Sequence, residues 1–521
     1  MKWRSLSVLL VLALVLGAFS LSAFAEGKYG GTFIFGRGGD SVGLDPIQVT
    51  DGESFKVTQQ IYDTIVQYKP GTTEVIPGLA KEWEVSDDGL RWTFYLREGV
   101  KFHDGNPVNA EAIKWNFDRW RLVDHPYHIG GDFTYYSYMF QGFPGIIKEV
   151  NAVDEYTVEF VLTEPQAPFL NNLGMVSFGI ASPAAVKKWG EDYFKHPVGS
   201  GPFKFVEWKK DDRIVLEANE DYWGGRPYLD KVVFRSIPDN GARYMELQAG
   251  TIDMMDYINP EDVASVKENP ELDLVLRPSF NVGYFAMHQN FPPFDNVLIR
   301  RAFNHAINKE NLIGAFYAGL AQPAKNPLPP SLWGYNDEIK DYEYDLEKAK
   351  ELLAKAGYPD GFEFDLWYMP VPRPYFPQPK LVAQAIQYYL SQIGVKANLK
   401  TVDWGTYLDK YYADELPTYL LGWTGDNGDP DNFLYVLLDQ TQNNCGYKND
   451  ELHEILLEAQ RTVDHERRVE LYMKAQEIIH NDAPWVPIAH STPPLVKRSY
   501  VKNYIPNPTS TEKFHRVWLD K

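Results

Sequence analysis

The sequence predicts a mixed α/β protein, because strand-like and helix-like segments alternate irregularly along the chain. Trp92, Phe94 and Leu96 fall on one face of an extended segment, which is the period-two pattern of a half-buried strand. Asn109 directly precedes an apolar-patterned run, as the capping residue of a helix does. At 521 residues the chain is long enough for about three domains.

The same patterns predict further elements in both halves of the chain. Strands are expected at 231–235 and 272–276, where β-branched and large apolar residues are concentrated. Helices are expected from the cap Asp345 to Gly357, and at 381–393, 449–463 and 464–480, the last with Asp464 as its cap and Val469, Tyr472 and Ile479 facing inward.

Composition excludes several classes of protein. The formal net charge of -20 argues against nucleic-acid binding, which depends on basic side chains that neutralise phosphates. The single cysteine, Cys445, cannot form an intrachain disulfide and excludes cysteine-based zinc ribbons and iron–sulfur clusters. Only one stretch is strongly apolar, so a polytopic membrane protein is also excluded.

That apolar stretch is at the N-terminus and predicts a secretory signal peptide at 1–25. Lys2 and Arg4 precede the uncharged run Val8–Phe19, and Ala23-Phe24-Ala25 is a small-x-small cleavage pattern. An uncleaved membrane anchor is the alternative. No cysteine follows the run, so a lipoprotein is not expected. We therefore expect an exported, periplasmic protein that is cleaved after Ala25.

A search for catalytic and metal-binding motifs finds no GxSxG, P-loop, HExxH or CxxC pattern. His125 and His128 share a loop, which allows a metal site but equally a surface loop. The acidic segment at 426–432 resembles a calcium loop but lacks the glycine and terminal glutamate of the EF-hand. We expect no metal and no cofactor.

Several longer motifs carry a resemblance to a known family. They are Pro77–Gly89, Leu96–Gly105, Gly199–Phe203, Asn281–Tyr284, Trp333–Asp337, Gly422–Phe433 and Ile488–Thr492. Together they resemble the peptide-binding class of ABC-transporter solute-binding proteins over nearly all of the chain after the signal peptide. The segments Met369–Tyr375 and Gly422–Asp426 resemble the dipeptide-binding branch of that class.

The resemblance implies a periplasmic solute-binding fold of the cluster C type, a hinged two-sided clamp of three mixed α/β lobes. Carried onto this sequence, lobe I would be discontinuous, with lobe II inserted into it and lobe III facing it across a cleft. The expected ranges are 26–62, 183–280 and 492–521 for lobe I, 63–182 for lobe II and 281–491 for lobe III. Proline-bearing segments at both crossings between lobes I and III suit hinges.

The resemblance also implies a charged pair in the cleft, with Asp426 binding the ammonium and Arg373 the carboxylate of a free peptide. A guanidinium binds a carboxylate in bidentate geometry, so this pair suits the two ends of a zwitterion. Two fixed charges would also measure peptide length, since an extended residue spans about 3.3–3.6 Å. Without the resemblance, Asp426 would be interpreted as a turn residue and Arg373 as a solvated one.

Other cleft residues follow from the same resemblance. Tyr375, Trp404 and Trp423 would line the cleft, although aromatic residues more often serve cores. The facing wall would come from Thr50, Asp51 and Gly52. Asp51 departs from the family pattern, in which this position is uncharged, and this could favour tripeptides or basic side chains.

The leading functional hypothesis is a non-enzymatic, monomeric receptor of an ABC importer. It would bind di- or short peptides and deliver them to a membrane permease with its cytoplasmic ATPases. The same fold binding an oligosaccharide, a nickel chelate or glutathione is one alternative, because fold does not determine ligand. A secreted hydrolase that uses paired carboxylates is the other, and no pair is singled out by a motif.

Overall fold

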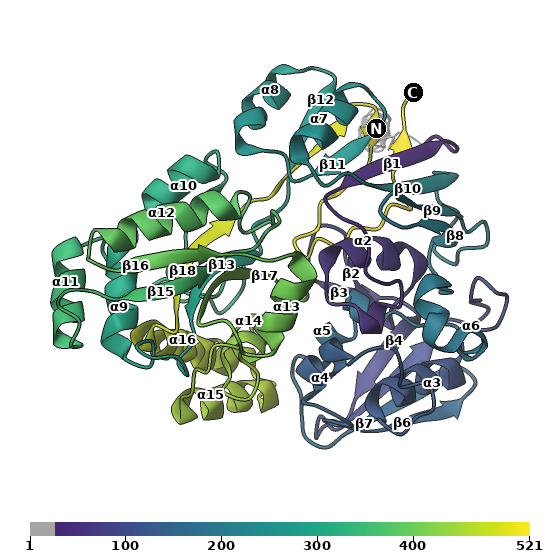
Figure 1. Cartoon of the computed structure of the whole chain (residues 1–521). Coiled ribbons are helices and arrows are strands. Elements are labelled where there is room, and N and C mark those ends of the chain that lie inside the picture. Colours follow the sequence, from purple (N-terminus) through teal and green to yellow (C-terminus); the bar gives the residue numbers. More distant parts are fainter. Residues whose placement is uncertain (1–26) are drawn as a thin grey trace, which may run out of the picture.

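The computed structural model describes residues 27–521, so the predicted signal peptide and its cleavage site lie outside the described residues. Three bodies, each built on a β-sheet, form the molecule (Figure 1). The bodies are named here by their sheets, which have seven, four and six strands. The mixed α/β class and the clamp architecture are therefore as predicted.

The seven-stranded sheet is assembled from both ends of the chain. Its order is β12-β19-β11-β1-β10-β9-β8. The strands are β1 (Thr32–Arg37), β8 (Phe203–Lys209), β9 (Arg213–Ala218), β10 (Lys231–Ser236), β11 (Met254–Asp256), β12 (Leu272–Leu276) and β19 (Pro494–Arg498). β1 pairs in parallel with β10 and β11, and the other pairs are antiparallel. Helix α2 (Gly52–Ile61) belongs to this body and begins at the site described below.

The four-stranded sheet is antiparallel throughout, with the order β4-β5-β7-β6. Its strands are β4 (Ala80–Val85), β5 (Arg91–Leu96), β6 (Ile147–Asp154) and β7 (Thr157–Leu162). Trp92 and Phe94 of β5 stack on one another, as the predicted alternation requires. The helices α3 (Ala110–Arg121), α4 (Thr134–Phe140) and α5 (Phe169–Asn172) belong to this body.

The six-stranded sheet has the order β14-β18-β13-β17-β15-β16. Its strands are β13 (Asn281–Met287), β14 (Ala321–Pro323), β15 (Glu363–Trp367), β16 (Lys396–Lys400), β17 (Thr418–Thr424) and β18 (Trp485–Ser491). Every residue of the central strand β13 is buried. The helices are α9 (Val297–Ala306), α10 (Lys309–Phe316), α11 (Leu346–Lys355), α12 (Pro379–Ser391), α13 (Trp404–Tyr412), α14 (Asp431–Leu438), α15 (Asp450–Arg461) and α16 (His465–Asp482).

The predicted helix caps are confirmed. The side chains of Asn109, Asp345 and Asp464 each accept a hydrogen bond from a backbone N–H in the first turn of the following helix. The helix expected at 381–393 begins two residues earlier, at Pro379, because proline is accommodated in a first turn. The expectation that Val469 faces inward is only partly correct, because its side chain is half-buried.

Two extended segments connect the seven-stranded and six-stranded bodies (Figure 1). One joins β12 to β13 and the other joins β18 to β19. Arg277, in the first crossing, forms a buried ion pair with Glu512 near the C-terminus. The ranges given above for three lobes stay a prediction.

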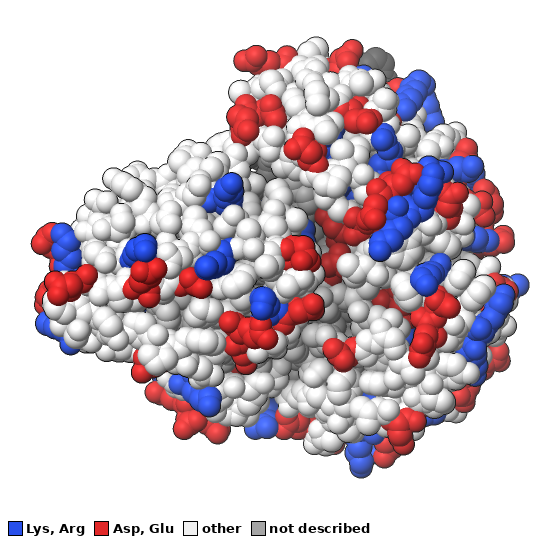
Figure 2. Space-filling view, viewed as in Figure 1, with Lys and Arg blue, Asp and Glu red and all other residues white. Residues whose placement is uncertain are grey.

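The four-stranded and six-stranded bodies touch on the side away from these crossings. The amide of Ala167 donates to the carbonyl of Gln460 at 2.7 Å. The side-chain amide of Asn427 donates to Asn172 Oδ1 at 2.8 Å. Figure 2 shows the resulting seam, with acidic side chains along part of it. Within residues 27–521, no helix combines the length and apolar character that crossing a membrane would require.

Candidate functional site

Asp426 lies just after β17, in the loop that leads into α14, and is half-buried at the seam. Its Oδ1 accepts a hydrogen bond from the Tyr135 hydroxyl at 3.2 Å, and its Oδ2 accepts from Asn432 Nδ2 at 3.3 Å. Asn432 Oδ1 in turn accepts from the Asp426 amide at 2.9 Å and from Trp423 Nε1 at 3.0 Å. The carboxylate is therefore held by neutral donors.

No basic side chain in residues 27–521 lies within 4.0 Å of the Asp426 carboxylate. Burial raises the pKa of Asp426 to about 7, and the hydrogen bonds from Asn432 and Tyr135 oppose that rise. Desolvation disfavours the charged form of a carboxyl group. A cation entering the cleft would therefore find a carboxylate that lacks a counter-charge.

Arg373 lies in the proline-rich loop between β15 and α12. Its amide and carbonyl both pair with those of Phe376 at 3.0 Å, which fixes a tight turn. The guanidinium carbon lies 4.5 Å from the ring centroid of Trp404, a cation–π contact that holds its plane. Among the described residues no carboxylate lies within 4.0 Å of this guanidinium.

Tyr375 is buried beside Arg373 and is fixed from two sides. Its carbonyl accepts a hydrogen bond from the Tyr317 hydroxyl at 2.8 Å. Its ring lies against Gly422 in β17, where a Cβ would stand 2.3 Å from Tyr375 Cδ2. Only glycine leaves room for the ring there, so the glycine of β17 positions the Arg373 loop.

The two predicted tryptophans are half-buried at the same end of the six-stranded body. Trp404 is the first residue of α13 and stacks on Tyr407, with ring centroids 5.8 Å apart. Trp423, in β17, holds Asn432 and through it Asp426. Each tryptophan therefore supports a different charged group: Trp404 contacts Arg373, and Trp423 supports Asp426.

The residues predicted to form the opposite wall of the cleft lie at the start of α2. Asp51 caps α2 by accepting from the Ser54 amide at 3.0 Å through Oδ1, while its Oδ2 is buried without a hydrogen-bond partner among the described residues. Burial raises the pKa of Asp51, while the Ser54 hydrogen bonds and the charge of Arg373 act against the rise. Thr50 is half-buried, and Gly52 is exposed with open space around it.

The first turn of α2 lies between the two charged groups. On one side, Phe55 packs edge-on against Tyr135, 5.5 Å between centroids, and Tyr135 donates to Asp426. On the other side, Lys56 Nζ lies 4.8 Å from the ring centroid of Tyr257, which lines a cavity of about 30 Å³ together with Arg373. The structure thus connects Asp426 and Arg373, each through intermediate contacts, to the first residues of α2, and their role in binding stays a prediction.

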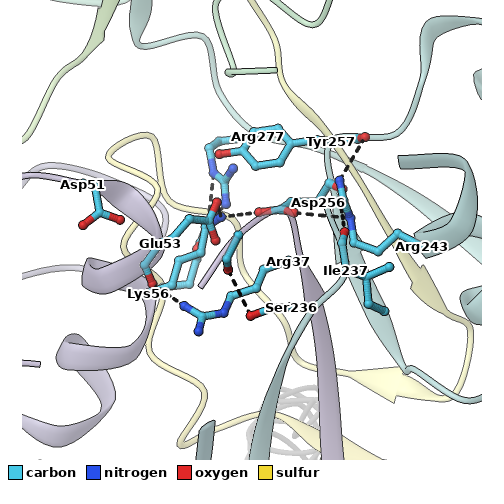
Figure 3. Close-up of polar contacts among 12 residues, drawn as sticks. Arg37, Asp51, Glu53, Lys56, Ser236, Ile237, Arg243, Asp256, Tyr257 and Arg277 are labelled. Atoms are coloured by element: carbon cyan, nitrogen blue, oxygen red, sulfur yellow. Dashed lines mark hydrogen bonds and ion pairs between the residues drawn. The ribbon is translucent and has the colours of Figure 1, made fainter. Parts of the chain in front are cut away.

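A buried charge network behind this wall was not predicted (Figure 3). Lys56 Nζ bridges Glu53, at 2.9 Å, and Asp256, which is 200 residues away in sequence. Arg37 donates to the Glu53 carbonyl at 2.7 Å and pairs with Asp40 at 2.8 Å. The network joins α2 to β1 and β11, so it fixes the position of the helix start.

Sequence reasoning also missed Tyr135 and Glu53 as residues of the site. Tyr135 stands in the aromatic run Phe133–Phe140, in which no spacing distinguishes one ring from the next. Glu53 is an ordinary acidic residue in the first turn of a helix. Only the packing of separate bodies brings the two side chains to the cleft.

The comparisons with known proteins agree with this architecture. Residues 74–445 match the model of the bacterial extracellular solute-binding proteins, family 5. The chain belongs to this family. Its members are solute-binding proteins, so the family assignment supports a receptor and gives no support for catalysis.

Known proteins match the chain over nearly its whole length. A dipeptide-binding protein of Escherichia coli is 40% identical over 99% of both chains. A heme-binding protein A of Haemophilus influenzae is 41% identical over 100% of both. A periplasmic binding protein associated with an ABC transporter from Helicobacter pylori, solved with the peptide STSA, is 39% identical; the match has a TM-score of 0.89 and covers 95% of this chain and 99% of that one.

Proposed function

We propose that this protein is the extracytoplasmic receptor of an ABC importer and binds short peptides by their two charged ends. Asp426 takes the ammonium, and Arg373 takes the carboxylate. Tyr375, Trp404 and Trp423 hold these groups in place, and Thr50, Asp51 and Gly52 form the opposite wall. The monomeric protein delivers the peptide to a membrane permease that is driven by cytoplasmic ATPases.

One observation carries the proposal: among residues 27–521, no basic group lies within 4.0 Å of the Asp426 carboxylate and no carboxylate lies within 4.0 Å of the Arg373 guanidinium. A buried charge left unpaired is costly, and a ligand that pairs both groups removes that cost. A free peptide is a zwitterion and supplies both counter-charges in one molecule. A neutral oligosaccharide would satisfy neither of them.

The relatives support this ligand class and leave the peptide length open. The names of these relatives and the peptide bound in the solved structure cover a dipeptide, the four-residue peptide STSA and heme. We propose di- and other short peptides, and heme is the competing ligand to be tested beside them.

Calorimetry tests the proposal on the exported protein after unfolding and refolding, which releases any ligand carried through purification. Ala-Ala, its N-acetylated form, its C-terminally amidated form and hemin are titrated in parallel. We expect binding of the free dipeptide and loss of affinity when either end is blocked. Equal affinity for all three peptide forms, or tight binding of hemin alone, would overturn the proposal. Mass spectrometry of the recovered peptide shows whether it is cleaved.

A further inference from the structure

The start of α2 carries two carboxylates whose bonding is incomplete. Asp51 uses Oδ1 to cap the helix, and Glu53 uses Oε1 to bind Lys56 at 2.9 Å. Asp51 Oδ2 and Glu53 Oε2 are both buried and have no hydrogen-bond partner among the described residues. Glu53 is only 4% exposed, so its free oxygen lacks ready access to solvent.

The two carboxylates differ in how their charge is compensated. Glu53 lies near several cations. Burial raises the pKa of Glu53, but the charges of Lys56, Arg37 and Arg373 outweigh burial, so the pKa is lowered. Asp51 has no basic group within 4.0 Å among the described residues. Figure 3 shows Asp51 apart from the network, with no contact drawn to it. Asp51 is therefore the carboxylate of this wall that lacks a counter-ion.

Capping alone does not require that charge. Asparagine caps a helix as well as aspartate does, because a side-chain oxygen is all that the N2 and N3 amides need. Asp51 is in addition partly desolvated, which makes its negative charge costly. A side chain that only capped α2 would not need a second oxygen that is buried and has no hydrogen-bond partner among the described residues.

In the proposed function, the peptide carboxylate sits on Arg373, and Arg373 is close enough to Asp51 to act on its charge. Binding would therefore bring a second anion next to an unpaired one. A cationic side chain on the same peptide residue would compensate both anions. Lysine and arginine side chains are long enough to reach past their own carboxylate to a neighbouring acceptor.

We propose that Asp51, backed by Glu53, is a specificity-determining residue that selects short peptides with lysine or arginine as their C-terminal residue. The free oxygen Oδ2 accepts the ammonium or guanidinium, while Oδ1 keeps its hydrogen bond to Ser54. This inference rests on the proposed function, because it places the C-terminal residue at Arg373.

The test uses pairs of dipeptides that differ only in side-chain charge or in sequence order. Calorimetry compares Ala-Lys with Ala-norleucine, which has a similar stem without the ammonium, and with Lys-Ala. We expect Ala-Lys to bind about tenfold more tightly than either, which corresponds to about 1.4 kcal/mol. Asp51→Asn should reduce that ratio to near one by weakening Ala-Lys binding, and Ala-norleucine should bind somewhat more tightly to the variant, because the repulsion between Asp51 and the peptide carboxylate is removed.

The matched control is Asp345→Asn, which changes another helix-capping aspartate, at the start of α11, away from the cleft. It should leave the tenfold preference intact. If Ala-norleucine binds but Ala-Lys is no tighter, or if Lys-Ala is the preferred isomer, the inference is wrong and the proposed function stands. If no dipeptide binds, the proposed function itself fails. A preference that survives in Asp51→Asn would also overturn the role of Asp51.

Discussion

The hydroxyl of Tyr135 in α4 donates a hydrogen bond to the carboxylate of Asp426, across 3.2 Å and 291 positions of sequence. The two residues belong to different bodies, the four-stranded and the six-stranded one. The bond therefore exists only while these bodies are in contact. The group proposed to bind the ligand ammonium is thus completed by closure of the clamp.

Peptide binding should depend on pH through Asp426. Its pKa of about 7 lies above the ordinary value of 3.8, so the free folded protein holds a proton there that the unfolded chain releases. This group therefore stabilises the free protein less as the pH rises from about 4 to 7. A ligand ammonium needs the ionised form, so affinity should fall as the pH drops below 7, by up to about tenfold per unit.

Asp426→Asn checks the origin of this pH dependence. The variant keeps the shape and one acceptor but cannot ionise, so its weaker binding should be independent of pH between 5 and 7. Calorimetry in buffers of different ionisation enthalpy should show proton release on binding at pH 6 in the unaltered protein only. An unchanged pH profile in the variant would assign the dependence to another group.

Removing Arg373 should discriminate between peptide ends. Arg373→Ala should weaken binding of free-carboxylate dipeptides by about two to three and a half powers of ten, since breaking a buried charge pair costs about 3–5 kcal/mol. C-terminally amidated peptides should lose little. Calorimetric titration of both peptide forms against the unaltered protein and the variant gives the four affinities to be compared. Equal losses for the two forms would show that Arg373 acts by packing on Trp404.

Gly422→Ala should damage the site through Tyr375. The added Cβ would stand 2.3 Å from the Tyr375 ring, so the ring and the Arg373 loop must shift, at a cost of about 1–3 kcal/mol in stability. Affinity for free-carboxylate peptides should fall with it. Gly314→Ala is the matched control, because open space surrounds Gly314 inside α10. That change should stabilise the protein by about 0.5–1 kcal/mol. Thermal unfolding and calorimetry measure both effects.

The seam between bodies should set the balance between open and closed forms. Asn427→Ala removes the hydrogen bond to Asn172 and leaves the buried Asn172 oxygen without this partner only in the closed form. We expect a larger radius of gyration without ligand and affinity lower by up to about tenfold for every peptide alike. Small-angle scattering and calorimetry check this result. Asn398→Ala, on the edge strand β16, removes only an exposed hydrogen bond to Glu363 and should change neither quantity.

The parts of the fold that could be predicted are those that local pattern determines. Neighbouring residues alone determine the alternation in β5 and the helix caps Asn109, Asp345 and Asp464. The motifs around Arg373 and Asp426 single out these two charged groups, and their binding role stays a prediction. Tyr135 and Glu53 could not be found in the same way, because their place in the site depends on how three bodies pack. The bridge of Lys56 between Glu53 and Asp256 is a further long-range contact of this kind.

The position of β19 in the seven-stranded sheet governs the order in which the chain can fold. β19 (494–498) lies between β12 and β11, so those strands cannot join into one sheet until almost the whole chain has been synthesised. Pairings this distant in sequence form slowly. Until then, β11 and β12 present unpaired edges that can pair with other chains. While the chain is incomplete, the first body to be started is therefore the one whose strand edges stay unpaired longest, and it is the body most exposed to aggregation.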